Sequence, residues 1–232
     1  MCWRPMNRHD DYYNQARDEQ TFPPLLRFIN RLEREASSDF EIIEDQFEQI
    51  EALYDRLENL YHAQITFKQN IKLFFERALQ LNDNLKRYQI IIDKVDVGEH
   101  IEELFHECES HFYDFHQSER VFEDIWKETI VTINQNRENI FREKILFQEL
   151  YRMAEIALND RNYIQLEIIR IRAEDQFSIA ARIEETSLEA SKLCRDFGNE
   201  LRDELARLET DLTQVVKLAL RRIQEIQKGI HS

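Results

Sequence analysis

Apolar residues recur at helical spacing along most of this chain. The first long seam alternates steps of three and four residues, the pattern of a coiled coil, and comprises Phe40, Ile43, Phe47, Ile50, Tyr54, Leu57 and Tyr61. The phase then slips near residues 65–67 and resumes at Ile71, which lets a long helix bend or change partner. The pattern predicts a helix from residue 37 to about residue 82, continuing through LKRYQIIIDKV.

Two further long helices are predicted after this one. Asp96-Val97-Gly98 is the clearest break, and a second helix runs from about Glu99 to Ile156. Its predicted inner positions are Leu104, Phe112, Phe115, Phe122, Ile125, Trp126, Ile133, Ile140, Phe147 and Tyr151. Residues 159–162, with the sequence NDRN, read as a tight turn before a third helix that ends near Lys228. The seam of this third helix contains Phe177, Ile183, Cys194, Phe197, Leu201, Leu208, Leu212, Val215 and Ala219, and Gly198 interrupts it, which predicts a bend or a close approach.

The chain before residue 37 divides into two predicted parts. Residues 1–21 are polar and aperiodic, and we expect them to be disordered. Residues 22–36 predict a short amphipathic helix, with Pro23 and Pro24 in its first turn, where amide hydrogens are not needed. Ser37, Ser38 and Asp39 form an N-cap cluster that starts a new helix, so residues 37–232 are expected to form the main domain.

Composition strengthens the all-α prediction. The 232 residues include only three Gly and three Pro, whereas a sheet protein needs many turns. Helices of ~65–100 Å cannot fold into a ball. We therefore expect an elongated antiparallel three-helix coiled-coil bundle that dimerises through long kinked helices, because its aromatic stripes exceed what three helices cover.

Candidate chemistry is sparse, and we expect neither an enzyme nor a cofactor. A single ExxH occurs, Glu103 to His106, whereas carboxylate-bridged di-iron bundles use two together with two further Glu. Three widely spaced cysteines, Cys2, Cys108 and Cys194, suggest reduced thiols. No run of apolar residues is long enough for a spanning helix, and the first residues lack the apolar core of a signal peptide. The net charge of −15 argues against nucleic-acid binding and limits membrane contact to local basic or apolar patches.

Two such patches are candidate membrane surfaces. In the short helix, the predicted membrane-insertion residues are Phe22, Leu25, Leu26, Phe28, Ile29 and Leu32, and the predicted headgroup-binding residues are Arg27, Arg31 and Arg34. The alternative is that this helix packs back on the bundle. Around the turn at residues 159–162, the predicted headgroup-binding residues are Arg142, Lys144, Arg152, Arg161, Arg170 and Arg172. The alternative there is ordinary solvation of charged side chains.

Three segments carry a family resemblance over residues 22–230. LLRFINRLEREASSDFEIIEDQFEQIE resembles the amphipathic linker and first helix of sorting nexins of the BAR class. RENIFREKILFQELYRMAEIA is similar to the end of that family's second helix, and LCRDFGNELRDELARLETDLTQVVKLAL to its third. Arfaptin-like and other BAR families share this architecture.

The resemblance implies a crescent-shaped homodimer or heterodimer with a related BAR protein. Such a dimer would sense or induce curvature on endosomal membranes and support cargo sorting, with an anionic membrane surface and endosomal sorting complexes as partners. Two features depart from the family pattern: only residues 1–21 precede the linker, so no phosphoinositide-binding PX domain is expected, and the net charge is −15. The alternative function is a coiled-coil adaptor that binds partner helices away from membranes.

Overall fold

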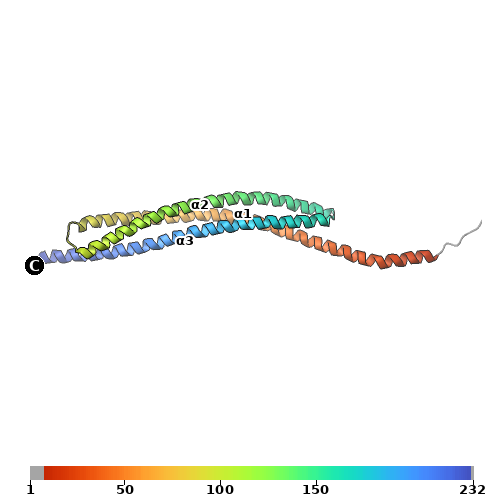
Figure 1. Ribbon diagram of the computed structural model, residues 1–232, viewed down its shortest axis with the longest axis horizontal. Coiled ribbons are helices and arrows are strands. Elements are labelled where there is room, and N and C mark those ends of the chain that lie inside the picture. Colours follow the sequence, from red (N-terminus) through yellow and green to blue (C-terminus); the bar gives the residue numbers. More distant parts are fainter. Residues whose placement is uncertain (1–7, 231–232) are drawn as a thin grey trace, which may run out of the picture. The chain divides into compact units, whose positions relative to one another are not determined.

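The computed structural model describes the backbone of residues 8–230 and the side chains of residues 23–229. The described backbone forms three α-helices and no strand (Figure 1). The helices are α1 (Arg8–Ile92), α2 (Glu99–Asn159) and α3 (Tyr163–Ile230). The prediction of an all-α fold is therefore confirmed. Contacts divide the chain into unit 1, residues 1–54 and 139–182, and unit 2, residues 55–138 and 183–232.

A strict seven-residue repeat of buried positions runs along α1. The repeat comprises Ala36, Ile43, Ile50, Leu57, Gln64, Ile71, Ala78, Leu85 and Ile92, each at most 3% exposed. The predicted phase slip near residues 65–67 is therefore wrong. The repeat continues through the polar residue Gln64, which occupies a core position and left no apolar signal in the sequence.

In unit 1, apolar side chains of α1 pack against α2 and α3. The rings of Phe40 and Tyr151 lie 5.5 Å apart between centroids. Those of Tyr54 and Phe141 lie 5.9 Å apart. Residue numbers thus rise along α1 as they fall along α2, so the two segments have opposite chain directions in this unit. Buried positions of α2 and α3 complete this core with Ile140, Phe147, Ala154, Ala157, Leu166, Ile169, Ala173 and Ala180.

Unit 2 contains an aromatic core and a polar layer. Phe75 makes edge-on contacts with Phe115 and Phe122 at centroid distances of 6.2 and 5.7 Å. In the polar layer, buried Gln64 donates from Nε2 to the carbonyl oxygen of Ser191, 2.9 Å away, and to the Ser191 hydroxyl. The Gln64 Oε1 atom is buried without a hydrogen-bond partner.

The two breaks between helices lie where the sequence predicts them. Gly98 has φ +94°, a conformation that glycine adopts without steric cost, and its carbonyl accepts the amides of Ile101 and Glu102 at the start of α2. At the end of α2, Arg161 has φ +55° and its amide donates to Leu158 O, while the Asn162 amide donates to Ala157 O. This is a Schellman end with arginine where glycine is usual.

The start of α1 differs from the sequence prediction. The sequence predicts disorder over residues 1–21, a separate helix over 22–36 and a new helix start at residues 37–39. The structure instead has one uninterrupted helix from residue 8 through all of these segments. Residues 1–7 lie outside the described range. Pro23 and Pro24 lie within this helix instead of in its first turn. The predicted capping residues act otherwise, because the Ser37 hydroxyl donates back to Glu33 O at 2.9 Å and Asp39 pairs with Arg170.

Candidate membrane-binding surfaces

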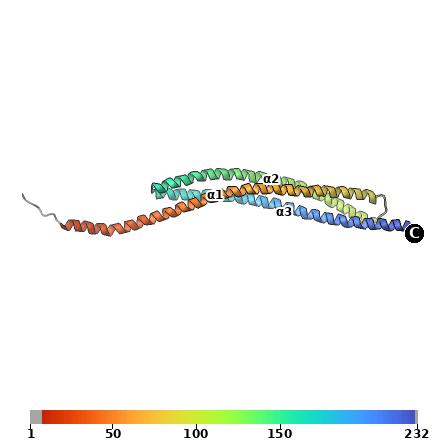
Figure 2. The same ribbon diagram turned by 180° about the vertical axis from the view of Figure 1, so that it is seen from behind.

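The first candidate surface is the segment of α1 from Leu25 to Arg34. In unit 1, Glu33 contacts Arg161 of the α2–α3 turn, and the part of α1 before this contact extends past the turn with no other helix beside it (Figures 1 and 2). Leu26 and Phe28 are 47% and 57% exposed, Leu25 and Ile29 are also exposed, and Leu32 is half-buried. The side chain of Phe22 lies outside the described residues. The alternative in which this segment packs back on the bundle is therefore not observed.

The exposed apolar stripe continues the buried seam of α1. Ile29 lies seven residues before Ala36 and fourteen before Ile43, so the three share one helix face. Ala36 and Ile43 are buried, whereas Ile29 is 39% exposed. The same face is therefore covered within unit 1 from residue 36 onward and uncovered before it.

Three arginines occupy the other side of this segment. Arg27, Arg31 and Arg34 are all exposed. Arg31 Nε lies 2.8 Å from Glu35 Oε1, and Arg34 Nε donates to Asn30 O at 3.2 Å. The Glu35 contact raises the pKa of Arg31 through a hydrogen bond and charge attraction. Exposed pairs of this kind are weak, so the arginines can exchange them for lipid phosphates.

The basic residues near the α2–α3 turn divide into two groups. Lys144 lies 2.9 Å from Glu51, and Arg170 lies 3.2 Å from Asp39 and 3.1 Å from Glu174. These two side chains are half-buried and join helices within unit 1. Because their charges are already compensated, they are less suited to headgroup binding than the sequence suggested.

The remaining basic residues near the turn face solvent. Arg161 lies 4.0 Å from Glu33, a long contact between partly exposed side chains. Arg142, Arg152 and Arg172 are exposed and form no ion pair with any described residue. All six predicted basic residues near the turn thus lie in unit 1. Only Arg142, Arg152, Arg161 and Arg172 remain available to bind an external anion.

Two carboxyl groups of unit 1 have raised pKa values. Burial raises the pKa of Asp39, and Arg170 offsets this effect only in part because Glu167, Glu35 and Glu174 repel the charged form. Burial alone raises the pKa of Glu143, whose carboxylate accepts a hydrogen bond from Gln176 Nε2. Unit 1 therefore holds acidic groups that ionise less readily than solvated ones.

Sequence reasoning missed apolar residues that surround two of the predicted arginines. Phe141, Ile145, Leu146, Met153 and Ile156 of α2 are between 40% and 53% exposed, on the side away from the buried seam of Ile140 and Phe147. The signal was present in the sequence, because these five positions do not fit the seven-residue repeat of inner residues. They occur beside Arg142 and Arg152.

No site for metal chemistry is found in the described part of the chain. No group of three or more His, Cys, Asp or Glu side chains among residues 23–229 is placed to hold a metal ion. The thiols of Cys108 and Cys194 are buried, and burial raises the pKa of each. Within α1–α3 as described, no helical stretch combines the length and the apolar character that crossing a bilayer requires.

Comparisons with protein-family models, with curated proteins and with solved structures find no match to this chain.

Proposed function

We propose that this protein is a BAR-type scaffold that dimerises and associates with the surface of endosomal membranes. The observation that carries the proposal is the uncovered amphipathic segment at Leu25–Arg34 of α1. Leu26 and Phe28 present large apolar surfaces to solvent, while Arg27 and Arg31 lie on the other side of the helix. This arrangement suits a helix that lies in the bilayer interface, with apolar side chains in the acyl boundary and arginines at lipid phosphates.

Dimerisation is supported by apolar surface that the single chain leaves uncovered. Besides the α1 segment, large apolar side chains are exposed on α2 and α3 of unit 1, including Ile164 at 76% and Ile171 at 47%. Monomeric proteins rarely expose so many large apolar residues close together. A second copy or a related BAR protein would bury part of this surface.

The net charge of −15 limits how the protein meets a membrane. An anionic leaflet repels the chain as a whole, so apolar insertion must contribute more than general electrostatic attraction. We therefore propose that the α1 segment initiates binding. We also propose that the protein supports membrane curvature and cargo sorting. This part of the proposal depends on the resemblance to sorting nexins.

Vesicle cosedimentation tests the proposal. Purified chain is mixed at low salt with small vesicles containing phosphatidylserine, and the pelleted fraction is measured for the native sequence and for Leu26→Glu with Phe28→Glu. We expect the double variant to bind about thirtyfold more weakly, because two inserted side chains each contribute ~1 kcal/mol. Two charges placed at exposed positions of unit 2, Asn70→Glu with Leu73→Glu, serve as the matched control. Equal pelleting of both variants, or none of the native chain, contradicts the proposal.

A second candidate function is a coiled-coil adaptor, and the continuity of the α1 stripe favours it. Because Ile29 shares its face with the buried Ala36, a partner helix could extend the bundle over residues 25–32. This function predicts no vesicle binding. It predicts instead a higher melting temperature in the presence of a specific partner helix.

A further inference from the structure

We draw no further inference here: the strongest candidate, the groove of unit 2 between α2 and α3 lined in part by Leu104, Glu107, Cys108, Asp211, Val215 and Leu218, combines two exposed carboxylates with a single buried thiol, and nothing among the described residues that line it selects a ligand.

Discussion

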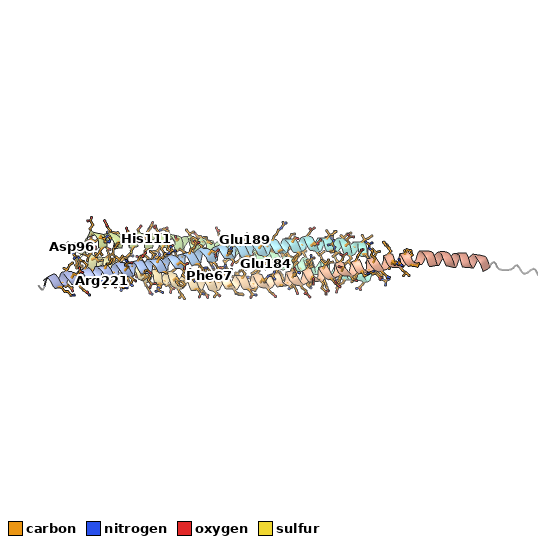
Figure 3. All side chains as sticks on the ribbon, turned by 90° about the horizontal axis from the view of Figure 1, so that it is seen from below. Phe67, Asp96, His111, Glu184, Glu189 and Arg221 are labelled. Carbon is orange, nitrogen blue, oxygen red and sulfur yellow. The ribbon has the colours of Figure 1, made fainter. Side chains whose placement is uncertain are left out.

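Gly198 of α3 lies directly against the ring of Phe67 of α1, and the two helices approach through this glycine. A Cβ atom added at position 198 would stand 2.8 Å from Phe67 Cζ and 2.9 Å from Phe122 Cε2 (Phe67 is labelled in Figure 3). Contacts this short require a ring to move. The glycine predicted from sequence to mark a bend or a close approach thus marks a close approach.

Gly198→Ala is expected to lower the free energy of unfolding by about 1 kcal/mol. Alanine favours the helix by ~1 kcal/mol, but overpacking against two aromatic rings typically costs ~1–3 kcal/mol. Urea denaturation measures the net effect. In a Phe67→Leu background the contact with Phe67 is relieved while the contact with Phe122 remains, so the same substitution should be less destabilising. A stabilising effect in the native background would show that the rings yield freely.

Gln64→Leu is expected to raise the free energy of unfolding by about 1 kcal/mol, while making the helix register less specific. The substitution removes a buried Oε1 that has no partner, and the Ser191 hydroxyl can donate within its own helix, as Ser187 does to Ile183 O at 3.1 Å. Urea denaturation measures stability, and the number of methyl NMR signals reports alternative registers. A decrease of more than about 1 kcal/mol would show that the polar layer stabilises the native fold.

Glu143→Gln tests the raised pKa of this carboxyl group. Because folding raises the pKa of Glu143, the folded state binds the proton more tightly, and stability falls as pH rises from the ordinary carboxyl range through the raised value. Glutamine is neutral at every pH and can still pair with Gln176. The variant should therefore be more stable than the native chain at pH 7 and match it below about pH 4. Glu149→Gln removes the same charge from an exposed site, and an equal pH-dependent gain there would show that burial of Glu143 is not the cause.

Arg161→Gly is expected to stabilise the turn between α2 and α3 by about 0.5–1 kcal/mol. Arg161 holds φ +55°, which disfavours a side chain with a Cβ atom. Its ion pair with Glu33 is 4.0 Å long and exposed, so removing this pair offsets little of the gain. Thermal denaturation compares Arg161→Gly with Arg161→Ala. If both variants are equally destabilised, the arginine side chain itself supports the turn.

Helix ends were predictable where local chemistry dominates. Gly98 supplies a positive φ before α2. At the other end of α2, the backbone amide of Asn162 donates to Ala157 O. The side-chain Oδ1 of Asn162 accepts the Gln165 amide at the start of α3. The positive φ of Gly98 and the side-chain cap from Asn162 Oδ1 depend on residue type, whereas the backbone amide that ends α2 is supplied by any residue except proline. The predicted cap at Ser37 failed because the same hydroxyl can also bond back to the carbonyl four residues earlier, as it does with Glu33.

The candidate surfaces were predictable only in part. The amphipathic pattern of residues 25–34 is visible in the sequence, but its exposure depends on how far α2 and α3 reach along α1. The exposed apolar residues of α2 beside Arg142 and Arg152 stand out in the sequence because they do not fit the seven-residue repeat, but periodicity alone cannot say which of the two apolar sides of α2 is covered. The buried position of Gln64 was likewise invisible, since a polar residue in a heptad resembles a slip.

The insertion of Phe28 into a bilayer is the most direct test of the proposed function. A Phe28→Cys chain that also carries Cys2→Ser is labelled with an environment-sensitive fluorophore; the buried thiols of Cys108 and Cys194, with their raised pKa values, should react slowly. Leu73→Cys, at a residue 64% exposed in unit 2, provides the matched control. On addition of phosphatidylserine vesicles, the emission from position 28 should shift to the blue and be quenched by brominated lipid, while that from position 73 stays unchanged. No change at position 28, or the same change at both positions, would contradict membrane binding through the α1 segment.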